Sequence, residues 1–259
     1  MTSSYILLPG WSMHQSVFYP LQSVLSQYAP TICVDYRNIA SKEEITNRTK
    51  QMIAAVTTSS IFHPMKNKGD DNRKVTLIGW SLGAIAALET ALALPEKINR
   101  LILISGTACF VQEKRKGWSA RIVKKMQESI ISSPEETLKA FDQLLFSEEE
   151  KEKWLPYFVE CIRPSFSKDS PKSLFYGLDY LLYTDVREKL SALHVPTLFI
   201  HGEKDQICPL AAVTTITKKI PHSQMHIVPN AGHVPFLTQR EQCLDKILEF
   251  CLEEVADGK

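Results

Sequence analysis

Short apolar runs alternate with longer amphipathic segments along most of this chain. The runs typical of β-strands cover residues 5–8, 31–34, 75–78, 101–104, 197–200 and 225–228. Segments with helical spacing cover residues 17–28, 43–57, 82–94, 210–219 and 240–254. Continuous apolar runs indicate strands that are buried on both faces, and strands that alternate with helices predict a parallel sheet. We therefore expect an α/β fold, with a mostly parallel sheet flanked by helices.

The alternation is interrupted between residues 107 and 185. This stretch has no β-type run, and amphipathic segments follow one another at 120–131, 135–146, 149–161 and 171–183. Strand-type runs resume at Thr197, so the sheet is interrupted rather than finished. We predict an α/β core of residues 1–106 and 186–259, and a helical cap of residues 107–185 above the carboxyl ends of the strands. Because the chain starts almost directly with a strand, the amino-terminal edge of the sheet should be shortened.

Composition and charge exclude several classes of protein. The chain has 259 residues, 44% of them hydrophobic and 23% charged, a balance that rules out a disordered or fibrous chain. Its net charge of +1 gives no global field for nucleic acid or for an anionic membrane. The longest apolar run, 82–94, contains Glu89 and is shorter than the ~20 residues that cross a bilayer. Six cysteines without a C-x-x-C pair favour a reduced, cytoplasmic location. We expect a monomer without a metal or cofactor.

The strongest chemical signal is the pentapeptide Gly-Trp-Ser-Leu-Gly at residues 79–83. It lies between a predicted strand and a predicted helix, the context in which G-x-S-x-G forms a nucleophile elbow. Glycines on both sides of the serine allow the close backbone approach that such a strained turn requires. Ser81 would then lie at a helix N-terminus, where the helix dipole favours a developing anion. The alternative is a serine that only caps the helix.

A serine hydroxyl becomes a good nucleophile when a histidine, oriented by a carboxylate, removes its proton. With this type of elbow the acid and then the histidine follow the serine in the chain. That order excludes His14 and His63 and leaves His194, His201, His222, His226 and His233. We choose His233 because its segment Asn-Ala-Gly-His-Val-Pro-Phe, residues 230–236, forms a predicted loop after the last strand.

The acid is expected after the strand at 197–200, where the chain continues His-Gly-Glu-Lys-Asp-Gln-Ile-Cys-Pro over residues 201–209. We assign Asp205, with Glu203 as the nearby alternative. Capping of the helix that starts near Pro209 is the structural alternative for Asp205. A buried, ionised aspartate would fix the histidine tautomer and stabilise the imidazolium.

Acyl transfer also requires two backbone N–H groups that face the oxyanion. The amide of Leu82, directly after the nucleophile, is one candidate. The amide of Trp11 is the other, since Gly10 permits a sharp turn after the first strand; packing of Trp11 on the core is compatible with this role. Trp80 borders the nucleophile, and Phe141 in the predicted cap completes the oxyanion and substrate-binding candidates.

Taken together, Pro-Gly-Trp at 9–11, the elbow at 79–83, Gly-Glu-Lys-Asp at 202–205 and the loop at 230–236 resemble the α/β-hydrolase superfamily. Within it, the elbow, the Gly-Trp loop and G-L-x-x-L-x-x-x-D-x-R at 177–187 are similar to the pimeloyl-acyl carrier protein methyl ester carboxylesterase family of biotin synthesis. This resemblance implies a serine carboxylesterase with Ser81, Asp205 and His233 as its triad.

Some positions depart from that family. Pro9 stands where a histidine is usual, Ala84 where a second glycine is common, and residues 35–38 lack the usual glycine-rich continuation. A general short-chain acyl carboxylesterase therefore stays open as an alternative. A menaquinone-pathway lyase of the same fold is disfavoured because Ala84 and Ile85 occupy the place of its usual arginine, and a non-enzymatic ligand-binding descendant is disfavoured by the complete triad.

The resemblance also implies an acidic acyl carrier protein as partner, for which a basic docking surface is expected. The predicted cap is balanced, with 12 Lys and Arg against 13 Asp and Glu. Six basic residues nevertheless occur between residues 114 and 125 with no acidic residue among them. We predict carrier contacts by Arg115, Arg121 and Lys124; a solvated helix face is the alternative.

Overall fold

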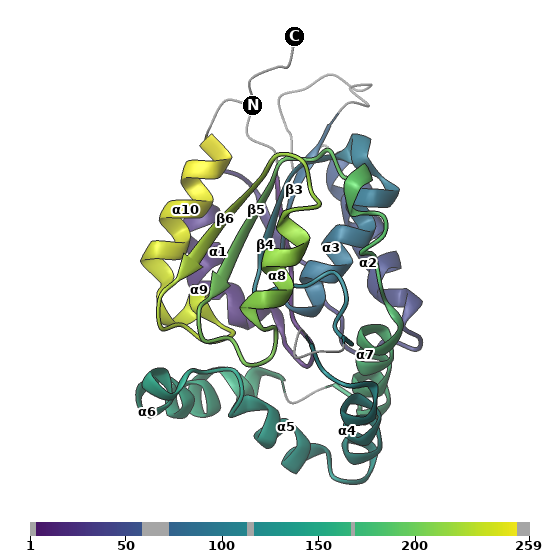
Figure 1. Ribbon diagram of the computed structural model, residues 1–259, viewed down its shortest axis with the longest axis vertical. Coiled ribbons are helices and arrows are strands. Elements are labelled where there is room, and N and C mark those ends of the chain that lie inside the picture. The colour runs from purple at the N-terminus through teal and green to yellow at the C-terminus, as the bar shows by residue number, and fades with distance from the viewer. Residues whose placement is uncertain (1–3, 59–72, 113–116, 167–168, 253–259) are drawn as a thin grey trace.

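The computed structural model describes residues 4–58, 73–112, 117–166 and 169–252, which form one sheet with helices around it (Figure 1). The sheet has six strands in the order β2-β1-β3-β4-β5-β6, and every neighbouring pair is parallel. The strands are β1 Tyr5–Leu8, β2 Thr31–Cys33, β3 Val75–Trp80, β4 Ile98–Ile104, β5 Thr197–Gly202 and β6 Ser223–Val228. The six predicted strands and the parallel α/β class are confirmed.

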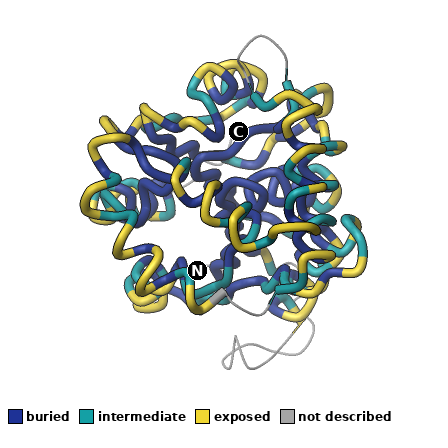
Figure 2. The backbone as a smooth tube through the Cα atoms, turned by 90° about the horizontal axis from the view of Figure 1, so that it is seen from below, coloured by how far each residue is buried: buried dark blue, intermediate teal, exposed yellow. Residues whose placement is uncertain are grey.

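Burial differs between the middle and the edge of the sheet. Every residue of β1, β3 and β5 is buried, as the continuous apolar runs predict. The expectation that all six strands are buried on both faces was wrong for both edge strands: Thr31 and Ile32 of β2 are half-buried, and Ile227 of β6 is 42% exposed. The reason is their place at the ends of the strand order, because an edge strand has only one neighbour. Figure 2 shows the buried backbone gathered in the interior of the molecule.

The helices of the predicted core cover the two faces of the sheet. They are α1 Tyr19–Leu25, α2 Glu43–Thr58, α3 Leu82–Ala93, α8 Leu210–Thr217, α9 Pro235–Thr238 and α10 Arg240–Leu252. Helix α1 starts later than predicted, because a 3₁₀ turn at Gln15–Phe18 precedes it and Pro20 occupies its first turn. Among the helices of the described segments, none is both long and apolar enough to span a membrane.

Four more helices form a layer at the carboxyl ends of the strands (Figure 1). They are α4 Ala120–Ser132, α5 Pro134–Asp142, α6 Glu148–Tyr157 and α7 Pro171–Tyr183. Helix α5 ends before the predicted residue 146, because the chain turns there toward the loop after β6, and the Leu145 carbonyl accepts a 2.8 Å hydrogen bond from the His233 amide. An isolated antiparallel bridge joins Cys109 to Asp185, so the chain enters and leaves this layer at one place. The division into core and cap at residues 107–185 stays a prediction.

Candidate active site

Ser81 lies on the sharp turn between β3 and α3. Its φ of 56° and ψ of −118° belong to a region that side-chain-bearing residues rarely adopt, so the turn is strained. Its amide donates to the Ile104 carbonyl at 3.1 Å, and its carbonyl accepts from the Ala84 amide at 2.9 Å. A Cβ at Gly83 would overlap the Leu8 carbonyl. The glycine is therefore required by the close approach of the α3 backbone to the end of β1.

Asp205 and His233 form a buried pair. They lie in the loops that follow β5 and β6, at the carboxyl end of the sheet. His233 Nδ1 and Asp205 Oδ2 are 2.8 Å apart. Asp205 Oδ1 accepts hydrogen bonds of 2.9 Å from each of the Ile207 and Cys208 amides. With the carboxylate ionised, His233 Nδ1 is the donor, which leaves Nε2 as an acceptor. Nε2 is buried, and no group among the described residues hydrogen-bonds it.

Glu203, the alternative acid, lies elsewhere. Glu203 is exposed to solvent, and its Oε2 accepts a 3.0 Å hydrogen bond from the Asn230 amide. The structure therefore brings Asp205, and not Glu203, into contact with the His233 imidazole.

A second histidine, His201, faces the same carboxylate from the end of β5. Its Nε2 lies 2.7 Å from the Cys208 carbonyl and 3.5 Å from Asp205 Oδ2. Burial lowers the pKa of His201. Burial by itself raises the pKa of the Asp205 carboxyl, but its interactions with His233 and then His201 outweigh burial and hold that pKa below its usual value. In the sequence, His201 was considered only as an alternative to His233; its spacing of four residues from Asp205 was the available signal for this contact.

Trp80, the last residue of β3, connects the serine turn to the histidine loop. It is 1% exposed, and its indole Nε1 donates a 2.8 Å hydrogen bond to the His233 carbonyl. Its ring centroid lies 5.6 Å from that of His233. A Cβ at Gly10 would lie 3.1 Å from the Trp80 ring and 3.2 Å from Ser81 Cβ. Trp80, the residue directly before Ser81, therefore contacts both the histidine loop and the loop of Gly10, and Gly10 also lies close to Ser81. No hydrogen bond joins Ser81 to His233 within the described residues, and the assignment of Trp80 to substrate binding stays a prediction.

The two candidate oxyanion donors border one small pocket of about 20 Å³, lined by Gly10, Trp11, Ser12, Leu82 and neighbouring residues. Leu82 is the first residue of α3, where backbone N–H groups have no acceptor within the helix. The Trp11 indole donates to the Leu174 carbonyl at 2.8 Å, and its ring meets Phe141 edge-on at a centroid distance of 4.9 Å. The Trp11 ring thus packs against α5 and α7, and the role of its backbone amide as an oxyanion donor stays a prediction.

The sequence is similar to a known protein family and to named relatives. The model of the α/β hydrolase fold family matches residues 6–239. The chain belongs to this family. A pimeloyl-[acyl-carrier protein] methyl ester esterase of Nitrosomonas europaea is 27% identical, over 93% of this chain and 94% of that protein. The protein of the same name from Vibrio parahaemolyticus is 24% identical, over 95% of this chain and 92% of its own length.

Solved structures show the same fold. An esterase from Exiguobacterium antarcticum has a TM-score of 0.81 at 21% identity and covers 98% of this chain and 94% of its own. The enol-lactonase from Burkholderia xenovorans LB400 has a TM-score of 0.82 at 14% identity and covers 98% and 92%. At these identities the likeness concerns the fold alone.

In this α/β-hydrolase-fold chain, an apolar groove of about 410 Å³ runs between α4 and α5. We call it the cap groove; it is lined by Trp118, Ile122, Lys125, Met126, Ser129, Ser133, Glu136, Thr137, Ala140, Phe141 and Leu144. Phe141 packs against Trp11, and the Trp118 indole donates a 3.0 Å hydrogen bond to the Ile207 carbonyl. The cap groove therefore adjoins the loops that carry Trp11 and Asp205.

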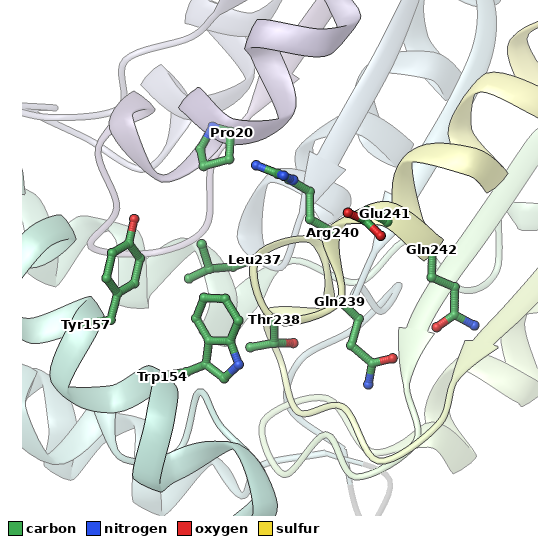
Figure 3. Close-up of a pocket in the computed structure, with 9 residues that line it drawn as sticks. All are labelled: Pro20, Trp154, Tyr157, Leu237, Thr238, Gln239, Arg240, Glu241 and Gln242. Carbon is green, nitrogen blue, oxygen red and sulfur yellow. The ribbon is translucent and has the colours of Figure 1, made fainter.

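A larger pocket of about 590 Å³ opens between α6 and the start of α10 (Figure 3). Its lining includes Trp154, Tyr157 and Arg240, and Ser81, Asp205 and His233 are not part of it. The lining of the cap groove does not include these three residues either. We therefore place the candidate site at the elbow because of the strained Ser81 turn and the His233–Asp205 hydrogen bond. Within the part of the chain that the structure describes, no three His, Cys, Asp or Glu residues are grouped as metal ligands.

The predicted carrier contacts lie on α4. Arg121 and Lys124 are exposed there, and Lys125 lines the cap groove beside them. Arg115 lies outside the described residues.

Proposed function

We propose that this protein is a serine carboxylesterase of biotin synthesis that hydrolyses the methyl ester of a pimeloyl group carried on acyl carrier protein. The hydrogen bond of 2.8 Å between His233 Nδ1 and Asp205 Oδ2, next to the strained Ser81 turn, carries the reaction class. The relatives named pimeloyl-[acyl-carrier protein] methyl ester esterase support the substrate.

In the proposed mechanism, Ser81 Oγ attacks the ester carbonyl while His233 Nε2 takes its proton. The amides of Leu82 and Trp11 stabilise the tetrahedral oxyanion. His233 then gives the proton to the leaving methoxide, so that methanol departs and an acyl-serine remains. Water activated by His233 hydrolyses the acyl-serine to the free carboxylic acid. Throughout, ionised Asp205 stabilises the imidazolium.

The cap groove supports a chain-like substrate. Its lining is mostly apolar, which suits a row of methylene groups, and Phe141 links it to the loop of Trp11. We propose that residues 107–185 cover the substrate in this way. A monomeric state, a cytoplasmic location and the lack of a nucleic-acid partner stay predictions.

The charge pattern of α4 supports docking of an acidic carrier. Arg121, Lys124 and Lys125 lie in its first two turns, and its first turn has no acidic residue. Arg121 lies in the first turn, where a cation opposes the helix dipole, so helix stability does not account for its placement. An acidic partner would offset the unfavourable charge.

Reversing the charge of this face should slow the reaction only on the carrier-bound substrate. We expect the Arg121→Glu/Lys124→Glu variant to lose about tenfold in kcat/KM on the carrier-bound ester at low salt, because surface charges act mainly on encounter. A small neutral ester should be hydrolysed at the normal rate. The matched control is Lys218→Glu/Lys219→Glu, the same charge change at exposed positions after α8. Equal losses on both substrates would instead indicate damage to the cap.

The rate should also depend on pH. Because only neutral imidazole accepts the Ser81 proton, kcat/KM for a p-nitrophenyl ester should rise as the pH is raised from about 5 to about 8. The lowered pKa of Asp205 keeps its carboxylate ionised over this range, so a single rising limb is expected. A flat profile would contradict histidine as the base.

The substrate assignment is tested by comparing kcat/KM on the pimeloyl methyl ester bound to its carrier with kcat/KM on dimethyl pimelate and on p-nitrophenyl acetate. Preference for the carrier-bound ester supports the proposal. Similar kcat/KM values on the carrier-bound ester and on dimethyl pimelate, which has the same methoxide leaving group, would make the protein a general short-chain carboxylesterase. Failure of Ser81 to react with a fluorophosphonate probe would overturn the serine mechanism itself.

A further inference from the structure

The carboxylate of Glu150, on the first turn of α6, reaches the loop that carries His233. Glu150 Oε2 accepts a 2.8 Å hydrogen bond from the Gly232 amide and a 2.9 Å hydrogen bond from the Ser147 amide. Gly232 is the residue directly before His233. One oxygen atom of the helical layer therefore holds the backbone next to the candidate catalytic histidine.

The surrounding backbone fits closely around this contact. The His233 amide donates to the Leu145 carbonyl at 2.8 Å, and Ser147 Oγ donates to the Asn230 carbonyl at 2.7 Å. A Cβ at Gly232 would lie 2.6 Å from the Ser147 nitrogen, so a larger residue cannot occupy that position without a shift of the backbone. The histidine loop and the segment before α6 thus form one packed unit.

Capping of α6 accounts for only part of the Glu150 contacts. As the third residue of the helix, Glu150 accepts from the Ser147 amide as a capping-box glutamate does. That function does not require the second bond to Gly232, 82 positions away in the chain. Nor does it require burial: Glu150 is 8% exposed, and a buried carboxylate is costly unless its hydrogen bonds are strong.

Hydrogen bonds hold the backbone of His233 on both sides and its ring nitrogen Nδ1. Glu150 fixes the preceding amide, Leu145 its own amide, Trp80 its carbonyl and Asp205 its Nδ1. Only Nε2 is left without a hydrogen bond within the described residues. We propose that Glu150 is a positioning residue for the catalytic histidine, through the Gly232 amide. This inference rests on the proposed function of His233 as the base.

The test compares three substitutions at Glu150 on a p-nitrophenyl ester. Glu150→Ala removes the acceptor, and we expect kcat to fall about 10- to 100-fold with KM changed less than about twofold, the result of a misplaced base. Glu150→Gln keeps an oxygen acceptor for both amides and should restore kcat. Glu150→Asp keeps the negative charge but is one methylene shorter, so its oxygen is withdrawn from the Gly232 amide and kcat should fall. The side chain of Ser147 still caps α6 in this variant, since it accepts from the backbone of residue 150.

Glu152→Ala, at an exposed position of the same helix, is the matched control and should leave kcat unchanged. The inference is overturned if Glu150→Ala lowers only the melting temperature, or if Glu150→Gln loses as much kcat as Glu150→Ala. Should Glu150→Ala fail to fold, normal kcat in Glu150→Asp would overturn it. Loss of the proposed function is recognised separately, by turnover that persists in Ser81→Ala.

Discussion

Replacing Ser81 by alanine should lower kcat for ester hydrolysis by roughly 10⁶-fold, the loss typical of removing a triad nucleophile. The residual rate would come from the oxyanion donors and from binding. The fold should persist, because the bonds that hold the turn belong to the backbone: Ser81 N to the Ile104 carbonyl and Ala84 N to the Ser81 carbonyl. We expect the free energy of unfolding to change by less than about 1 kcal/mol, as for removal of a hydroxyl without a buried partner.

Ser105 offers a matched control for this substitution. It is a buried serine with a φ of 46°, directly after the neighbouring strand β4. Ser105→Ala removes an equivalent hydroxyl from a similarly strained residue and should keep most of the activity. Burst kinetics with a p-nitrophenyl ester and labelling by a fluorophosphonate probe measure the difference. Comparable losses in both variants would mean that the hydroxyl of Ser81 acts through structure rather than as the nucleophile.

The fold could be predicted from local patterns because a parallel sheet demands them. Strands buried on both faces must be continuously apolar, and each crossover requires a helix, so both signals lie in contiguous sequence. Burial at the edge could not be predicted, because which strand ends the sheet depends on the strand order. The end of α5 at Asp142 was also missed, since it is set by contact with the distant histidine loop.

In the candidate site, too, some residues could be predicted from local sequence and others could not. Ser81, Asp205 and His233 could be chosen as candidates because each sits in a loop with a recognisable local sequence, and the chain order limits the choices. The structure brings His233 and Asp205 together, and their catalytic roles stay a prediction. Glu150 carries no such signal, since a capping glutamate is common on helices. Its contact with Gly232 joins residues 82 positions apart, so it depends on how α6 packs against the histidine loop.

A second contact of this kind holds the loop of Trp11, the candidate oxyanion donor. Arg163 pairs with the buried carboxylate of Asp142, with Nε and Oδ2 2.9 Å apart, and also donates a 2.9 Å hydrogen bond to the Ser12 carbonyl. Burial raises the pKa of Asp142, and the interactions with Arg163 oppose that shift. Ser12 has a φ of 60° and follows Trp11, so a residue 151 positions away supports a strained turn. Long-range pairs of this type leave no periodicity or motif in the sequence.

Asp205→Asn should lower kcat by about 10⁴-fold with the fold retained. The geometry explains why. The Ile207 and Cys208 amides both donate to Asp205 Oδ1, so the oxygen of an asparagine would take that place and its NH₂ group would face His233 Nδ1. Nδ1 would then have to accept, which puts the imidazole proton on Nε2. An Nε2 that carries a proton cannot take another from Ser81, so the base is lost although every atom stays near its position.

The control for this substitution is Glu203→Gln, which removes the other carboxylate of the same loop. Glu203 accepts a 3.0 Å hydrogen bond from the Asn230 amide, and a glutamine oxygen can accept the same hydrogen bond. Its kcat should therefore fall by less than about threefold, the size expected for a surface substitution. Both variants are compared by kcat on a p-nitrophenyl ester and by melting temperature. If Glu203→Gln were the more damaging of the two at unchanged stability, the carboxylate that orients His233 in solution would be Glu203, and the tautomer argument for Asp205 would fail.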